Sequence, residues 1–415
     1  MFCTTFIREQ SMVTTFDELA REVREITVTE TALRTYIALP RHLPSIRSSK
    51  GLEEGQALPE IKLLPGVKYR FDLEGFGNAL SAALKNEVAG YVIRLRHHGH
   101  TIYTLDWNWA KTPTDGSEGW TPNVRMHVAS CSKLVTAIAM TRLLHHRHIS
   151  PDTTIISWLP DYWAKGPGVD QISFRNLMTH TSGFNTGGSD SSFNVMKTQV
   201  AKGVTTRGTY HYENMNFGLC RILLSTINGN VAPSAVFSLP FPPNSNDVIW
   251  DFITINAYAN YVRQHLFKPS DVVGPGFDHP AHDALAYTFP VSGIGWNSGD
   301  LSYMSGGAGW HMSADDLLNV MGTFRRKSTI LSEAHAQQML QDGFGIDLIQ
   351  PTQLGTLYNK NGLWEDGSGH VEQSLAYFLP EHMEMVVLAN SPIGPTNQFF
   401  RDVVTNIYTA NIKPV

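Results

Sequence analysis

The chain has 415 residues, 42% of them hydrophobic and 10% aromatic, which is enough to bury a large core. Its formal net charge is −5, and no stripe of Lys and Arg with interleaved aromatic residues occurs, so we expect no nucleic-acid partner. The sequence has no run of about eighteen apolar residues, and its start, MFCTTFIREQ, lacks the apolar core of a signal peptide. We therefore expect a globular, cytoplasmic protein without a membrane span.

Three cysteines, Cys3, Cys131 and Cys220, lie far apart along the chain. An odd number at such spacing argues against a disulfide framework and fits a reducing compartment. We expect Cys131 and Cys220 to serve as small core residues.

Residues 1–75 are predicted to form an extension that wraps the main body. Within it, TTFDELAREVREI (14–26) indicates a short helix with Thr15 as a possible cap. The stretch from there to Phe71 is rich in Ser, Gly and Pro, and we expect it to be irregular.

The segment after the extension has sharper patterns. GNALSAALKNE (77–87) is helical, and two β-rich runs, 91–96 and 101–107, flank a turn with Gly99 at its tip. Short helical patterns and many loops follow over 150–295.

Two later segments have distinct patterns. VAPSAVFSLPFPPNSNDVIW (231–250) is so rich in proline that we expect no regular structure there. A helix begins after Ser313, whose side chain is a predicted cap with Asp316 at the third helical position.

The C-terminal region reads as two apolar strands around a Pro380-Glu381-His382 turn, followed by a helical stretch over 396–408. Strands therefore come from both chain ends and helices from the middle. The simplest architecture is an α+β fold, an α/β sandwich: one antiparallel sheet built from both ends, flanked by helices, with an inserted, mainly helical subdomain. The predicted boundaries are 76–128 with 296–415 for the α/β part and 129–295 for the helical part, all within one domain over 76–415.

Ser130 and Lys133 are the first candidates for chemistry. Residues three apart share one face of a helix, so both side chains project the same way. A serine hydroxyl becomes a good nucleophile when a base takes its proton, and burial or nearby cations can lower the pKa of a lysine enough for that role. The alternative is a capping serine followed by a surface lysine. The uncharged run LVTAIAMT after Lys133 favours a buried helix instead.

Two further groups of residues lie downstream. Tyr212 and Asn214 are two apart in TYHYENMNFGL and can point into one cleft, with the phenol as base or proton shuttle. In YNKNGLW, Lys360 could hold a substrate carboxylate or keep a phenolate ionised, and Gly362 permits close backbone approach. Taken alone, the first could be ordinary aromatic packing and the second a surface turn.

The order SxxK, YxN and KxG before paired C-terminal strands resembles the serine β-lactamase and penicillin-binding-protein superfamily. Its class C-like branch, with esterases, D-aminopeptidases and acyltransferases, is the most similar. The likeness spans roughly 76–410, and NLMTHTSGF, SGGAGWHMSADDLLNVM and FLPEHMEMVVLANS resemble further segments of that family. The resemblance implies a β-lactamase/transpeptidase-like fold.

Residue by residue, the resemblance implies Ser130 as the acylated nucleophile, Lys133 as its activating partner and Tyr212 as the base or proton relay. Asn214 would contact the substrate and Lys133. The third-motif lysine would be Lys360.

The resemblance also implies an oxyanion hole made of the backbone N–H of Ser130 and one near Leu363, with Gly362 beside it. Asn361 stands where the family usually has Thr or Ser. An extra-looking loop, LWEDGSGH, follows Gly362. Many esterases of this branch use a histidine in that region, so His370 is a second candidate for the third element.

These residues predict a serine hydrolase that acts through an acyl-enzyme on a small-molecule ester or amide, most simply a carboxylesterase, with no metal and no organic cofactor. An acyltransferase, in which 231–250 acts as a lid, a β-lactamase and a D-amino-acid peptidase are the alternatives with the same machinery. A non-catalytic scaffold that keeps the fold is the alternative of another class. The oligomeric state stays open.

Overall fold

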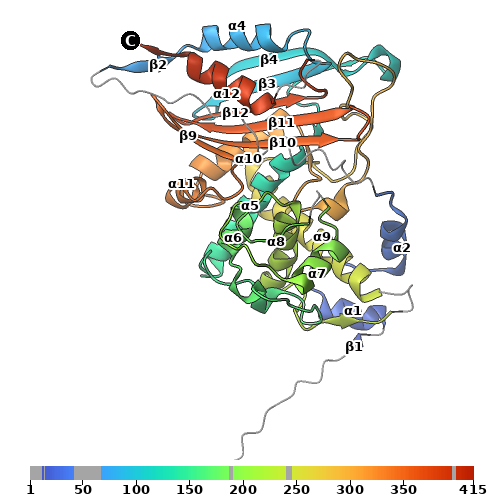
Figure 1. The fold of residues 1–415 in the computed structure, drawn as a ribbon. Coiled ribbons are helices and arrows are strands. Elements are labelled where there is room, and N and C mark those ends of the chain that lie inside the picture. Colours follow the sequence, from blue (N-terminus) through green and yellow to red (C-terminus); the bar gives the residue numbers. More distant parts are fainter. Residues whose placement is uncertain (1–11, 14, 42–66, 187–189, 240–244, 395–398) are drawn as a thin grey trace, which may run out of the picture.

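The computed structural model describes residues 12, 13, 15–41, 67–186, 190–239, 245–394 and 399–415. A large sheet with helices on both faces occupies one end of the molecule, and a group of helices occupies the other (Figure 1). The predicted α+β architecture is therefore confirmed. Cys3, residues 42–66 of the extension and the Pro-rich residues 240–244 lie outside the described residues.

The sheet has seven strands in the order β5-β4-β3-β12-β11-β10-β9, and every pairing in it is antiparallel. β12 pairs with β3, so the last long strand of the chain lies against the first. This agrees with the predicted sheet built from both chain ends. The strands are β3 (Gly90–His97), β4 (His100–Lys111), β5 (Glu118–Gly119), β9 (Leu348–Thr352), β10 (Gly355–Glu365), β11 (Val371–Leu379) and β12 (Met383–Ala389).

Both predicted hairpins are confirmed. Between β3 and β4 the turn residues His98 and Gly99 have positive φ, 49° and 84°, which suits a tight two-residue turn. Between β11 and β12 the turn falls at Pro380, Glu381 and His382, as expected from the sequence.

Helices cover both faces of the sheet (Figure 1). α4 (Leu73–Leu84) and α12 (Phe400–Ala410) share a core with one face, and α10 (Ala314–Arg326) packs on β3 and β12 from the other, beside α11 (Glu333–Gln341). The predicted cap of α10 is confirmed, because Ser313 Oγ accepts a hydrogen bond from Asp316 N at 3.0 Å. α4 begins earlier than the expected 77–87, since the Asp72 side chain caps it by accepting from Gly75 N.

The helical group includes α5 (Ser132–His146), α6 (Phe174–Met178), α7 (Phe193–Lys202), α8 (Asn214–Ile227) and α9 (Ser245–Val262), which continues into a π-helical turn, η6 (Arg263–Phe267). The expectation of irregular structure over 231–250 is wrong in part. Residues Val236–Phe237 form β7, and α9 starts at Ser245, directly after the prolines. Apolar packing of the α9 side chains, most of which are buried, favours the helix from Ser245 onward.

The N-terminal region contributes two helices. α1 (Phe16–Glu22) is capped by Thr15 as predicted. The expectation of irregular structure up to Phe71 is wrong in part, because α2 (Glu30–Ala38) forms there, whereas residues 42–66 lie outside the described residues. Burial of Leu33 and Tyr36 against α9 favours the helix, and Tyr36 O–H also donates to Asp251.

The remaining elements are short. They are β1 (Met12–Val13), β2 (Tyr69–Phe71), β6 (Met126–His127), β8 (His311–Met312), β13 (Ile412–Pro414), η2 (Pro113–Asp115), η3 (Ala129–Cys131), η4 (Ile156–Trp158), η5 (Val169–Gln171), η7 (Lys268–Ser270) and η8 (Ser302–Met304). None of the helices in the described ranges combines the length and the apolar character that a membrane crossing needs. The domain boundaries and the wrapping role of residues 1–75 stay predictions.

Candidate active site

Ser130 and Lys133 lie where η3 leads into α5, under β10 and β11. Ser130 Oγ is 2.9 Å from Lys133 Nζ, and both residues are buried, with 7% and 0% of their surfaces exposed. The serine does not cap the helix: the residue at the cap position of α5 is Cys131, and it makes no side-chain capping bond. The buried helix expected from the apolar run is confirmed, since residues 132–140 are all buried.

The backbone before the nucleophile candidate is strained. Ala129 has φ of +45°, an unfavourable left-handed conformation for a residue with a Cβ. The neighbouring Val128 holds it in place, because its N–H donates to Trp310 O at 2.9 Å and its C=O accepts from Ser374 Oγ at 2.6 Å. The surrounding structure therefore fixes the direction in which Ser130 points.

Lys133 is surrounded by neutral partners. Besides Ser130, its Nζ lies 2.6 Å from Asn214 Oδ1 and 2.7 Å from the Gly307 carbonyl oxygen. Burial, reinforced by the nearby Lys360 cation, holds the pKa of Lys133 well below its usual value. The lowered pKa favours the neutral amine, and a neutral amine has two N–H groups for the two carbonyl-type acceptors. Its lone pair is then free to accept the hydroxyl proton of Ser130.

Tyr212 lies in the loop directly before α8, and Asn214 is the first residue of that helix. The Tyr212 hydroxyl is 2.8 Å from Ser130 Oγ, and its ring stacks on His180 with centroids 4.3 Å apart. Burial and, next, the Asp347 carboxylate raise the pKa of Tyr212 well above its usual value. The phenol therefore keeps its proton at rest and can donate it to Ser130 Oγ.

Lys360 lies on β10, next to the same tyrosine. Its Nζ is 5.1 Å from the centre of the Tyr212 ring and 2.6 Å from Asp347 Oδ1. The second carboxylate oxygen of Asp347 accepts the backbone N–H of Asn361 at 3.1 Å. Sequence reasoning missed Asp347, because no motif surrounds it. Asp347 directly precedes β9, and the pairing of its own N–H with Asn359 O brings it to β10.

Gly362 touches the nucleophile turn. A Cβ at this position would lie 2.6 Å from Val128 O and 2.9 Å from Ser130 N, so only glycine lets the strand pass this close. Alternate amides of a strand point to the same edge. The Asn361 N–H points toward Asp347, away from β11, so the Leu363 N–H points to that edge too.

His370 lies apart from this group, in the loop between β10 and β11. Its Nδ1 is 2.6 Å from Asp366 Oδ2, and the structure records no contact between His370 and Ser130, Lys133 or Tyr212. Of the two candidates for the third element, the structure places Lys360 next to Tyr212 and His370 next to Asp366.

His127 and Glu372 form a buried hydrogen-bonded pair next to the turn that carries Ser130, and the sequence did not indicate this pair. His127 Nε2 accepts from Gly309 N at 3.1 Å, so Nδ1 carries the ring proton and donates to Glu372 Oε2 at 2.9 Å. Burial lowers the pKa of His127 to about 3 and raises that of Glu372 to about 8. The pair joins β11 to the strand three residues before Ser130.

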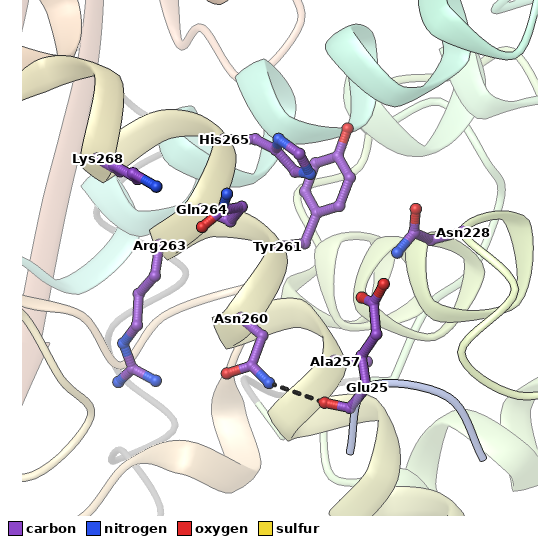
Figure 2. Close-up of a pocket in the computed structure, with 9 residues that line it drawn as sticks. All are labelled: Glu25, Asn228, Ala257, Asn260, Tyr261, Arg263, Gln264, His265 and Lys268. Atoms are coloured by element: carbon purple, nitrogen blue, oxygen red, sulfur yellow. Dashed lines mark hydrogen bonds between the residues drawn. The ribbon is translucent and has the colours of Figure 1, made fainter.

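A cavity of about 630 Å³ lies elsewhere, along the end of α9 and the turn that follows it (Figure 2). Asn260 Nδ2 donates to the backbone oxygen of Glu25 across it, at 3.4 Å. None of the residues that line it belongs to the predicted site.

Parts of this chain are similar in sequence to known proteins. Residues 76–238 match the sequence model of the Beta-lactamase family. The chain is 22% identical over 206 residues to "Putative penicillin-binding protein PbpX" of Bacillus subtilis (strain 168), a match that covers 47% of this chain and 45% of the relative. The chain thus spans about half the length of the curated relative that it matches.

Solved structures share the fold at low sequence identity. FmtA from Staphylococcus aureus superposes with a TM-score of 0.62 at 15% identity, over 94% of this chain and 97% of its own. D-amino acid amidase from Ochrobactrum anthropi SV3 gives 0.59 at 17% identity, over 80% and 98%. The class C β-lactamase from Rhodobacter sphaeroides gives 0.58 at 15% identity, over 81% and 99%.

The family match over residues 76–238 and the shared fold confirm the resemblance to the serine β-lactamase and penicillin-binding-protein-like superfamily that was drawn from the sequence. These findings support a serine hydrolase in general and leave its substrate open.

Proposed function

We propose that this chain is a serine hydrolase that cleaves a small-molecule ester or amide through an acyl-enzyme, with carboxylic esters as its first substrate class. One observation carries the proposal: Ser130 Oγ lies 2.9 Å from a buried lysine amine and 2.8 Å from a buried phenol. A base and a proton donor are thus each within hydrogen-bond distance of the nucleophile.

In the proposed acylation step, Ser130 Oγ bonds to the substrate carbonyl carbon while its proton passes to Lys133 Nζ. The negative charge that develops on the carbonyl oxygen is stabilised by the N–H groups of Ser130 and Leu363. As the tetrahedral intermediate collapses, the bond to the leaving group breaks. The leaving oxygen or nitrogen takes a proton from the Tyr212 hydroxyl, which regains one from Lys133.

In the proposed deacylation step, water attacks the acyl-Ser130 ester along the same route and releases the acid. An acyltransferase, a β-lactamase or a D-amino-acid peptidase would form the same acyl-Ser130 and differ only in the acceptor or the leaving group. The described part of 231–250 gives little support to a lid, because Phe237 and Trp250 are buried and lie together, with ring centres 6.3 Å apart.

The proposal is tested by incubating the protein with a fluorophosphonate and, separately, with p-nitrophenyl butyrate. We expect an adduct that peptide mapping places on Ser130, ester hydrolysis by the wild type, and loss of both in Ser130→Ala. Ser132→Ala is the matched control: its hydroxyl accepts from Trp310 N at 3.2 Å, and it makes no contact with Lys133 Nζ. This variant should keep the adduct and the activity. Neither adduct nor hydrolysis in the wild type would favour the non-catalytic scaffold.

A further inference from the structure

The third motif of this chain holds a cation that is already neutralised. Lys360 has no exposed surface, and its Nζ lies 2.6 Å from Asp347 Oδ1, a carboxylate that is itself only 9% exposed. A buried ammonium with a carboxylate partner at this distance has its charge satisfied inside the protein. A second carboxylate at this ammonium would meet a pair whose net charge is zero, so attraction to the cation would be offset by repulsion from Asp347.

Position 361 offers no replacement for that cation. The Asn361 N–H is bound by the other oxygen of Asp347, and its side chain has an amide in place of a hydroxyl. The Asp347 carboxylate therefore binds both the Lys360 ammonium and the Asn361 N–H at this edge of β10. A substrate carboxylate at this edge would meet the Asp347 carboxylate first.

The other groups that contact the serine add no free positive charge. In the described part of the chain, the cationic side chains that touch the Ser130 and Tyr212 pair are Lys133 and Lys360. The amine of Lys133 is surrounded by neutral acceptors, as described above. The segment that carries Tyr212 continues into Glu213, a buried carboxylate that accepts from Thr186 Oγ1 at 2.7 Å.

Apolar side chains flank the two ends of the predicted oxyanion hole. Ala129 precedes Ser130, Trp364 follows Leu363, and the two belong to one buried apolar cluster. The cluster consists of Ala129, Leu301, Tyr303, Met304, Ala308 and Trp364, with Trp296 packed against it. Buried apolar side chains next to the predicted oxyanion hole offer no partner to a charge, and a charge that loses its water without gaining a partner is disfavoured.

We propose that the Ser130 site selects substrates with an uncharged acyl group, because Asp347 occupies the Lys360 cation that would otherwise bind a substrate carboxylate. The inference rests on the proposed function and adds the substrate class. Esters and amides of neutral aliphatic or aromatic acids are the substrates it assigns. Acyl groups that carry a free carboxylate near the scissile carbonyl are the ones it excludes.

The first test needs no variant. Hydrolysis of p-nitrophenyl valerate is compared with that of p-nitrophenyl hydrogen glutarate, whose acyl chain ends in a carboxylate instead of a methyl group, after subtraction of the non-enzymatic rates. We expect kcat/KM to be at least about tenfold higher for the valerate, as a like charge next to the path of the substrate opposes its binding. Equal or faster hydrolysis of the glutarate would overturn the inference.

The second test changes the neutralising residue. Asp347→Asn frees the Lys360 cation, so the glutarate-to-valerate ratio of kcat/KM should rise by about tenfold, whatever happens to the absolute rates. Asp315→Asn is the control. It removes the partly buried ion pairs of Asp315, on α10, with Arg96 at 2.7 Å and Arg94 at 3.1 Å, and should leave the ratio unchanged. An Asp347→Asn protein with the wild-type ratio would contradict the role of Asp347.

A binding measurement separates failure of this inference from failure of the proposed function. Phenylboronic acid and 3-carboxyphenylboronic acid differ by one carboxylate, and calorimetry reports their affinities whether or not the protein turns over esters. We expect the uncharged acid to bind the wild type at least about tenfold more tightly. Tighter binding of the carboxylated acid would overturn the substrate class even if ester hydrolysis were found. An absence of hydrolysis together with the expected preference would overturn only the hydrolase proposal.

Discussion

Two buried lysines, one at the start of α5 and one on β10, lie next to the same tyrosine. Their Nζ atoms are 5.0 Å and 5.1 Å from the centre of the Tyr212 ring, and neither side chain is exposed. Lys133 has three neutral partners, whereas Lys360 has the Asp347 carboxylate. Residue type and burial alone therefore do not define the role of a side chain. The partner set makes one lysine suited to act as a base and fixes the other as half of an ion pair.

The largest expected effects come from replacing each lysine in turn, because the variant that loses more activity should lose less stability. Lys133→Met should lower kcat/KM by about 10³- to 10⁴-fold, since it removes the proposed base. Lys360→Met should lower it much less. In stability the order reverses: Lys360→Met leaves Asp347 unpaired and should cost about 3–5 kcal/mol. Lys133→Met leaves only neutral acceptors, at about 1–3 kcal/mol.

Ester hydrolysis and denaturant unfolding of the two variants check this prediction. The double variant Lys360→Met/Asp347→Asn, in which the pair is replaced by uncharged side chains, should recover most of the lost stability. If Lys360→Met proved the more damaging to activity and the less damaging to stability, the roles assigned to the two lysines would be exchanged.

A middle-sized effect concerns the pH dependence of the rate. A base works when unprotonated, so kcat/KM should rise with pH through the lowered pKa of Lys133. The Lys360 cation lowers that pKa, and the Asp347 carboxylate raises it. Lys360→Met should therefore move the rising limb to higher pH and Asp347→Asn to lower pH, each by about one unit.

The pH–rate profiles of both variants and the wild type, measured with p-nitrophenyl valerate, provide the check. Asp315→Asn again serves as the control and should keep the wild-type limb. Two shifts in the same direction, or none, would mean that Lys133 is not the group that titrates in this limb.

The smallest effect concerns the support beneath the serine. Burial raises the pKa of Glu372 from an ordinary 4.5 to about 8. The folded state therefore binds this proton more tightly than the unfolded state does. The stability that the proton contributes is complete below pH 4.5 and is lost as pH rises through about 8. The Glu372→Gln side chain cannot titrate but can still accept the hydrogen bond from His127. Between about pH 5 and pH 8 the Tm of this variant should therefore fall by a few degrees less than the Tm of the wild type.

Thermal unfolding across that pH range measures the difference. Glu381→Gln, at an exposed turn position, is the control and should follow the wild type. A Glu372→Gln protein with the full pH dependence of the wild type would assign the titration to another group.

Much of the fold could be predicted from the sequence where local signals act alone. Thr15 and Ser313 cap helices as expected, and the turns at Gly99 and Pro380 define the two hairpins. The failures lie where tertiary packing overrides the local signal. α2 was missed because its stability comes from burial of Leu33 and Tyr36 against α9, and no local pattern reports that contact.

The candidate site divides in the same way. The order of Ser130, Lys133, Tyr212, Asn214 and Lys360 is written in the chain, and the structure brings all five together. The sequence left Lys360 and His370 as alternatives. The choice depended on which of them the pairing of β10 and β11 places beside the serine turn.

The sequence by itself determined which residues are available for chemistry and in what order, because helical spacing and strand alternation are local properties of the backbone. Only the tertiary structure decided how protons and charges are distributed among them. The pKa of Lys133 follows from burial and from a cation on another element, and Lys360 is neutralised by Asp347, 13 positions away and outside every motif. Burial and charge arise from neighbours that the fold assembles, and no local pattern encodes them.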